Sequence, residues 1–123
     1  MAARVLVVDD SMMVRSMVGK VLTEAGFAVT AANDGVDALA KLDQAPEVQL
    51  IVCDVNMPKM NGIELLEELR IARQNKVPFI MLTTEDGAQV VARAKAVGAN
   101  GWLVKPLKPE LLLNAARKFL SGV

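Results

Sequence analysis

Polar side chains follow four short apolar runs of this sequence, and their types suggest chemistry on a phosphoryl group. They are three carboxylates, two hydroxyls and one ammonium: Asp9 and Asp10 after residues 5–8, Asp54 after 50–53, Thr83 and Thr84 after 77–82, and Lys105 after 101–104. Neighbouring ionised carboxylates repel one another, so such a set requires compensating cations. Lys105 can supply one charge, and oxygen ligands without histidine or thiolate suit Mg²⁺, whose open positions phosphate oxygens commonly fill.

Phosphoryl transfer to a carboxylate is the reaction that this set of groups could support. The transfer needs alignment and charge compensation, which the metal, the Lys105 ammonium and a threonine hydroxyl could provide. A carboxylate beside them would attack and form an acyl phosphate. Spacing alone does not decide which carboxylate attacks, but the shared loop favours Asp9 and Asp10 as the metal pair and Asp54 as the nucleophile. A helix cap is the simpler interpretation of the pair, although Ser11 can serve as that cap.

The composition bounds the protein class and excludes several functions. The 123 residues are 53% hydrophobic, and basic and acidic residues are equally numerous, which argues against a general nucleic-acid or membrane-surface binder. The absence of histidine excludes histidine triads, histidine zinc sites and a phosphohistidine carrier. The single cysteine, Cys53, cannot form an intramolecular disulfide, so a reducing, cytoplasmic setting is expected. We find no signal peptide and no run of about 20 apolar residues.

Apolar runs alternate with segments of helical spacing. The runs 5–8, 27–31, 50–53, 77–82 and 101–104 are rich in Val, Ile and Leu, and most do not alternate with polar residues, so they predict parallel strands that are buried on both faces. The expected core positions of the intervening helices are Met13, Met17, Val21 and Leu22; Val36, Leu39 and Leu42; Ile63, Leu66, Leu69 and Arg70; Val90, Val91, Ala94 and Val97; and Leu111, Leu112, Ala115 and Phe119. This alternation predicts an α/β fold with helices on both faces of a parallel sheet, whose ligands bind at the carboxyl ends of the strands.

Over essentially its whole length, the chain resembles the receiver domains of two-component response regulators. The resemblance rests on VVDDS at 7–11, CDVNMPKMNG at 53–62, MLTTE at 81–85 and GWLVKPL at 101–107, in order and at the expected spacing. NDGVDAL at 33–39 is most similar to single-domain chemotaxis regulators of the CheY type. The resemblance implies a flavodoxin-like (βα)5 doubly wound sheet with strand order 2-1-3-4-5. It also implies that residues 1–123 form one receiver domain without an output domain.

The resemblance assigns the carboxylates to specific roles. Asp54 would be the phosphorylation site. Asp10 and Asp54 would bind Mg²⁺ directly, with Mn²⁺ as a possible substitute, and the Asn56 backbone carbonyl would be a further ligand. Asp9 would act mainly through a metal-bound water.

The resemblance also implies a switch. Lys105 would pair with a phosphoryl oxygen, and a cis bond to Pro106 would place this lysine. Thr83 would hydrogen-bond the phosphoryl group, and Trp102 would change rotamer with it. Tryptophan departs from the smaller aromatic residue that is usual there, so ordinary core packing is the alternative for Trp102.

Two further positions concern the lifetime of the acyl phosphate. Asn56 and Glu85 occupy the family positions that tune it, and they match chemotaxis receivers that hydrolyse quickly, so a short lifetime is expected. Thr84 stands where small residues are usual and could narrow access to Asp54.

The implied output surface comprises the fourth helix, the run 101–104 and the last helix. It carries Arg93, Lys95, Trp102, Lys108 and Lys118 beside small apolar residues. The implied partners are a CheA-like histidine kinase, a downstream protein target such as the flagellar motor switch, and a phosphatase. We expect a monomer that binds neither nucleic acid nor membrane. It would not be a conventional enzyme, but it would catalyse its own phosphorylation and dephosphorylation.

Other functions stay open at this point. A phosphorelay intermediate or a phosphate sink would need the same residues. A flavodoxin-like module that binds flavin mononucleotide would prefer a Ser/Thr/Gly-rich first loop, whereas this chain has Asp9 and Asp10 there. A phosphatase of the haloacid dehalogenase type would usually carry an acid two residues after its nucleophile, where this chain has Asn56.

Overall fold

A computed structural model describes residues 3–45, 47–57, 59–83 and 88–120. Strands and helices alternate along the chain: β1 (Arg4–Val8), α1 (Met12–Glu24), β2 (Ala28–Ala32), α2 (Gly35–Gln44), β3 (Leu50–Asp54), α3 (Gly62–Glu67), the π-helical turn η1 (Glu68–Ala72), β4 (Phe79–Thr83), α4 (Ala88–Val97), β5 (Gly101–Val104) and α5 (Pro109–Leu120). Among the described residues, no helix combines the length and apolarity that a membrane span requires.

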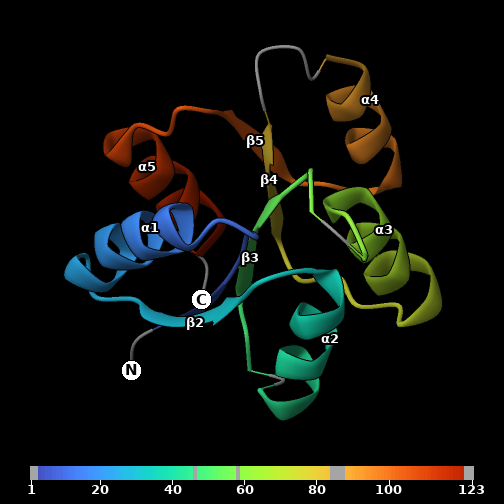
Figure 1. The fold of residues 1–123 in the computed structure, drawn as a ribbon, viewed down its shortest axis with the longest axis horizontal. Helices are drawn as coiled ribbons and strands as arrows, with labels where there is room; N and C mark the ends of the chain where they lie inside the picture. Colours follow the sequence, from blue (N-terminus) through green and yellow to red (C-terminus); the bar gives the residue numbers. More distant parts are fainter. Residues whose placement is uncertain (1–2, 46, 58, 84–87, 121–123) are drawn as a thin grey trace.

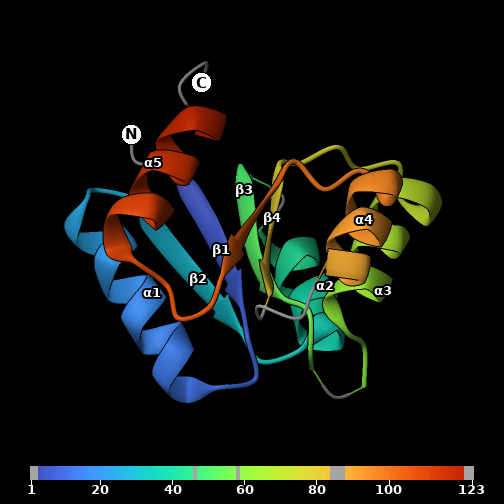
Figure 2. The same ribbon diagram turned by 90° about the horizontal axis from the view of Figure 1, so that it is seen from above.

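The strands form one parallel sheet in the order β2-β1-β3-β4-β5. This confirms the predicted α/β fold and its strand order 2-1-3-4-5. Helices α1 and α5 cover one face of the sheet, and α2, α3 and α4 cover the other (Figures 1 and 2). All strands point the same way, so their carboxyl ends lie along one edge, where the order reverses between β1 and β3.

Burial of the strands follows their place in the sheet. The three inner strands β1, β3 and β4 are buried on both faces, as the continuous apolar runs predicted. The same prediction is wrong for both edge strands. In β2 only Ala32 is buried, and in β5 Trp102 and Val104 are 41% and 48% exposed. The helices do not fully cover one face of the sheet at this edge, so alternate side chains of β5 remain in contact with solvent.

Some of the helix positions that were predicted to be buried are exposed in the structure. In α1 the buried side chains are Val18 and Leu22, whereas Met13 and Met17 are exposed, contrary to the prediction. Val36 and Leu111 are also exposed rather than buried. A helical stripe can be drawn through more than one set of apolar positions, and only the packing partner selects the set that is buried.

The helix ends follow the local sequence. Ser11 is the N-cap of α1, and its Oγ accepts the Val14 N–H at 3.3 Å. Asn61 caps α3 in a reciprocal capping box with Glu64. Gly26 follows α1 with a φ of 97° in the left-handed region, where glycine carries no Cβ penalty. These caps fix where α1 and α3 begin, and each of these helices is the next element after a strand that leads to the acidic residues.

Candidate active site

Three carboxylates from two adjacent strands meet at the carboxyl edge of the sheet. β1 and β3 are hydrogen-bonded neighbours, with Val8 opposite Cys53. Asp9 and Asp10 follow β1 and Asp54 ends β3, and each offers an oxygen that lies within 4.8 Å of the others. The prediction that these residues share one site therefore agrees with their geometry.

Asp9 is completely buried, and both of its carboxylate oxygens have partners. Oδ1 accepts the backbone N–H of Ser11 at 2.9 Å, and Oδ2 contacts Lys105 Nζ at 3.2 Å. Its backbone carbonyl accepts a hydrogen bond from the Arg15 guanidinium at 2.6 Å. Asp10, by contrast, is exposed. The two adjacent carboxylates thus differ in environment, and Asp10 is the one presented to a ligand from solvent.

Asp54 is 5% exposed and forms an ion pair with Lys105, whose Nζ lies 3.1 Å from Oδ1. Burial raises the pKa of Asp54 above its usual range, and the charge of Asp9 adds to this; Lys105 and the Asn56 backbone N–H partly offset both effects. Burial by itself lowers the pKa of Lys105, but its hydrogen bonds and charge interactions with Asp54 and Asp9 outweigh burial, so the net shift is upward. The single positive charge of Lys105 does not balance the three carboxylates of this cluster.

The donor set of this cluster fits a hard divalent cation. It contains carboxylate oxygens, one of them on the exposed Asp10, and it contains neither imidazole nor thiolate. The neighbouring thiol of Cys53 is fully buried, its pKa is raised by that burial, and its Sγ contacts the Asp54 carbonyl oxygen at 3.2 Å. Cys53 therefore acts as a small buried side chain, as predicted, and not as a ligand.

Lys105 is connected to the end of β4. Its backbone N–H donates to the carbonyl oxygen of Thr83 at 2.7 Å, and Thr83 is itself 4% exposed. The peptide bond between Lys105 and Pro106 is cis. Two of the predicted residues, Thr84 and Glu85, lie outside the residues that the structure describes.

Trp102 lies on β5, away from the acidic cluster in sequence. Its 41% exposure excludes the ordinary-core alternative for this structure. The Lys95 ammonium lies 5.8 Å from the centroid of its ring, a distance typical of a cation–π contact.

A family model for the response regulator receiver domain matches residues 5–117 of the chain. The chain belongs to the response regulator receiver family. The receiver is 39% identical over 111 residues to chemotaxis protein CheY1 of Helicobacter pylori, covering 89% of this chain and 90% of that protein. It is 41% identical over 121 residues to chemotaxis protein CheY of Treponema pallidum, covering 96% and 83%. The solved structure of chemotaxis protein CheY4 of Vibrio cholerae has 46% identity and a TM-score of 0.90, and the match covers 98% of this chain and 100% of that one.

Two residues of this receiver's site escaped prediction from the sequence. Gly62 lies so close to the end of β3 that an added Cβ would come within 2.4 Å of the Asp54 carbonyl oxygen. The Asn61-Gly62 turn was a visible signal, but the close approach comes from tertiary packing. Arg15 contacts the Asp9 carbonyl, and only its place one helical turn after the Ser11 cap could have suggested this.

Proposed function

We propose that this receiver accepts a phosphoryl group on Asp54 from a histidine kinase and serves as a CheY-like messenger in chemotaxis. The observation that carries the proposal is the buried Asp54 carboxylate, 3.1 Å from Lys105 Nζ and within 4.8 Å of oxygens from Asp9 and Asp10. An alternative explanation as a purely structural ion pair does not account for three carboxylates beside one lysine. Membership in the receiver family and the chemotaxis relatives add support.

In the proposed reaction, a carboxylate oxygen of Asp54 attacks the phosphorus of the donor. A new P–O bond forms while the P–N bond to the kinase histidine breaks, and the imidazole nitrogen leaves with the electron pair. Lys105 stands where its ammonium can bind a phosphoryl oxygen, and the Thr83 hydroxyl would bind another. In the return reaction, water attacks phosphorus, the P–O bond to Asp54 breaks, and inorganic phosphate leaves.

The proposed metal ligands are the carboxylates of Asp10 and Asp54 and the backbone carbonyl of Asn56, with Asp9 acting through water. When bound there, Mg²⁺ would neutralise the carboxylates and the charge on the transferred group. This protein's own residues hold the other reacting groups in position. Asp9 holds Lys105 at 3.2 Å, and the Asn56 backbone N–H donates to Asp54.

The proposed output follows from the added charge. A phosphoryl group brings nearly two negative charges to a buried position, which draws Thr83 towards it and changes the end of β4. Trp102 would respond from β5, and the face formed by α4, β5 and α5 would bind a downstream protein, for which the flagellar motor switch is a candidate. A phosphatase would be a further partner.

Phosphorylation by acetyl phosphate, followed by intact mass measurement, tests this function. We expect one added phosphoryl group in the presence of Mg²⁺ and none in EDTA. Asp54→Asn should abolish the adduct, whereas Asp43→Asn, an acid paired with Arg73 at the far end of α2, should leave it unchanged. An adduct that survives in Asp54→Asn, or that forms equally well in EDTA, would overturn the site.

A further inference from the structure

The contact between Arg15 and the acidic loop has no part in the function proposed above. Arg15 Nη1 donates to the backbone carbonyl oxygen of Asp9 at 2.6 Å, which is short for a bond between nitrogen and oxygen. Resting on the proposed function, we propose that Arg15 is a positioning residue for the metal ligand Asp10. It would act through the peptide bond that joins Asp9 to Asp10.

The argument begins with the rigidity of that loop. The Asp9 N–H donates to the Ala32 carbonyl at 3.2 Å, and the Ser11 N–H donates to Asp9 Oδ1 at 2.9 Å. These bonds secure the residues on either side of Asp10. Asp10 itself is exposed, so the direction of its carboxylate depends on the backbone that carries it.

The hydrogen bond from Arg15 fixes the orientation of the peptide plane between Asp9 and Asp10. The carbonyl of Asp9 and the N–H of Asp10 belong to one planar unit, so orienting the carbonyl orients the unit. Rotation of this plane would change the direction of the Asp10 Cα–Cβ bond and so move its carboxylate, which now has an oxygen within 4.8 Å of Asp54. The guanidinium therefore sets the distance between two of the proposed metal ligands without contacting either carboxylate.

The position of Arg15 on α1 makes this contact possible. Its backbone N–H donates to the Ser11 carbonyl at 3.0 Å, so it lies one turn inside the helix that begins after the loop. Side chains on a helix lean towards its N-terminus, which brings Arg15 back over Asp9. A guanidinium stays charged and gives a stronger hydrogen bond than a neutral donor would.

A purely electrostatic role for Arg15 makes the opposite prediction. The guanidinium is a positive charge near three carboxylates, so by Coulomb repulsion alone its removal should tighten the binding of a divalent cation. If Arg15 positions Asp10, its removal should weaken binding, because the ligands are no longer held in place. The sign of the change in affinity therefore separates the two roles.

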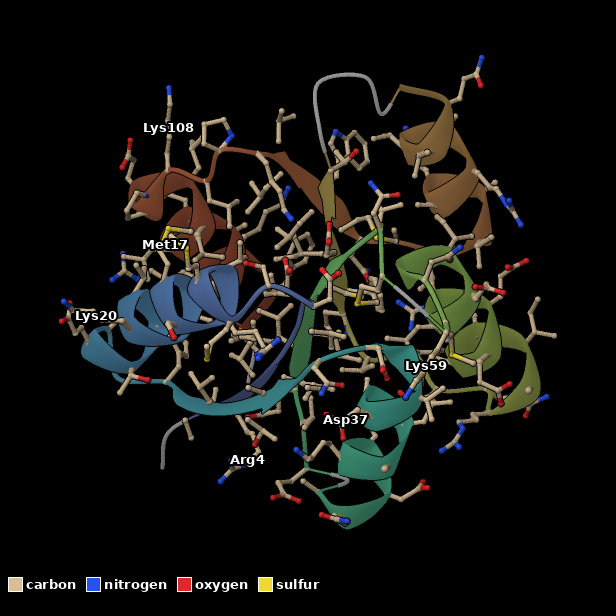
Figure 3. All side chains as sticks on the ribbon, in the orientation of Figure 1. Arg4, Met17, Lys20, Asp37, Lys59 and Lys108 are labelled. Carbon is tan, nitrogen blue, oxygen red and sulfur yellow. The ribbon has the colours of Figure 1, made fainter. Side chains whose placement is uncertain are left out.

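Metal titration of the full chain tests the proposal without relying on phosphorylation. The electron paramagnetic resonance signal of free Mn²⁺ would give its dissociation constant, and Mg²⁺ competition would give that of Mg²⁺. We expect about tenfold weaker binding for Arg15→Met, since loss of an outer-shell partner commonly costs that much, and an intermediate value for Arg15→Lys. Lys20→Met is the matched control, because Lys20 lies on the outer side of the same helix (Figure 3). This substitution removes one positive charge, as Arg15→Met does.

A second readout separates positioning from general damage. With acetyl phosphate, Arg15→Met should raise the Mg²⁺ concentration for half-maximal rate and leave the rate at saturating Mg²⁺ within about twofold of the unaltered protein. Circular dichroism checks folding, and Arg15→Lys carries the test if Arg15→Met does not fold. Unchanged or tighter Mn²⁺ binding in a folded Arg15 variant overturns this inference alone. Failure of the unaltered protein to bind Mn²⁺ overturns the proposed metal site and this inference together.

Discussion

Removing the Lys105 ammonium should destabilise the protein in a way that depends on pH. Lys105 Nζ lies 3.2 Å from Asp9 Oδ2 and 3.1 Å from Asp54 Oδ1, and these two side chains are 0% and 8% exposed. Lys105→Met keeps most of the side-chain stem but leaves two buried carboxylates without their shared cation. Repulsion and burial then act together on the charged form of both groups.

The distances and the exposure set the size of the effect. At about 3 Å and an effective dielectric constant of about 20, each lysine–carboxylate attraction is roughly 5 kcal/mol before desolvation is considered. The carboxylates can escape the full loss by binding a proton, which costs about 4 kcal/mol at pH 7 for an acid with an ordinary aspartate pKa. Because the lysine side chain is 26% exposed, solvent already screens part of the attraction. We therefore expect Lys105→Met to lower the free energy of unfolding by about 3 kcal/mol at pH 7.

The pH dependence follows from the upward shift of the Asp54 pKa. The folded protein already holds the Asp54 proton to a higher pH than the unfolded chain does, and the variant should hold it to a higher pH still. As pH rises from the usual aspartate range, the unfolded chain releases this proton first, so the variant's stability falls relative to the unaltered protein. In the unaltered protein Lys105 stays charged through neutral pH because its pKa is raised. Its contribution to the free energy of unfolding is therefore lost only as pH rises through that raised pKa.

Urea unfolding, monitored by circular dichroism between pH 4 and pH 8 without divalent metal, measures the effect. The deficit of Lys105→Met should be small near pH 4 and largest at neutral pH, and Mg²⁺ should reduce it. Lys108→Met is the control, because the Lys108 side chain extends away from α5 (Figure 3). A deficit below about 0.5 kcal/mol at pH 7, or one that is equal at pH 4 and pH 7, would refute the reasoning.

Two backbone positions allow paired tests of stability by the same method. Gly62→Ala should destabilise the fold by about 2 kcal/mol or more, because the added Cβ would lie 2.4 Å from the Asp54 carbonyl oxygen. Gly19→Ala in α1, where the nearest atom is 3.8 Å away, should instead stabilise it by about 0.5–1 kcal/mol, and equal effects would contradict the packing argument. Lys59 has a φ of 65°, so Lys59→Asn should stabilise by about 0.5 kcal/mol, since asparagine tolerates this region better. Lys76 has an ordinary φ, so Lys76→Asn should not stabilise the protein. An equal gain in stability there would refute backbone strain as the cause of the gain at Lys59.

The fold and the acidic cluster could be predicted because they depend on short-range signals. Five apolar runs separated by helical segments predict a parallel sheet, and in such a sheet the residues after neighbouring strands meet at one edge. That the strands before Asp9 and Asp54 are neighbours was implied only by the resemblance to receiver domains, and the structure confirms this strand order. The exposed side chains of Met13 and Met17 were not predictable in the same way, because the phase of α1 depends on its packing against β2 and α5.

Arg70 shows what the sequence could not reveal. Its place after Leu69 suggested the apolar side of a helix, but its guanidinium donates to the carbonyl oxygens of Gly98 and Asn75 and to Asn100 Oδ1. Burial lowers its pKa, and it joins the π-helical turn after α3 to the connection between α4 and β5. Its partners at Gly98 and Asn100 lie 28 and 30 residues away, so no local pattern marks them.

The two adjacent carboxylates after β1 differ in burial, and this difference suits them to different roles. Asp9 is buried with both oxygens engaged, so it is suited to hold Lys105 and the start of α1, while Asp10 is exposed to solvent. Lys105 contacts Asp54 through its ammonium and the carbonyl of Thr83 through its backbone N–H at 2.7 Å. A phosphoryl group on Asp54 would therefore compete with Asp9 for the same ammonium, and any shift of Lys105 would reach the end of β4 through one hydrogen bond. This short connection gives the proposed switch a physical route from the acidic cluster towards the α4-β5-α5 face.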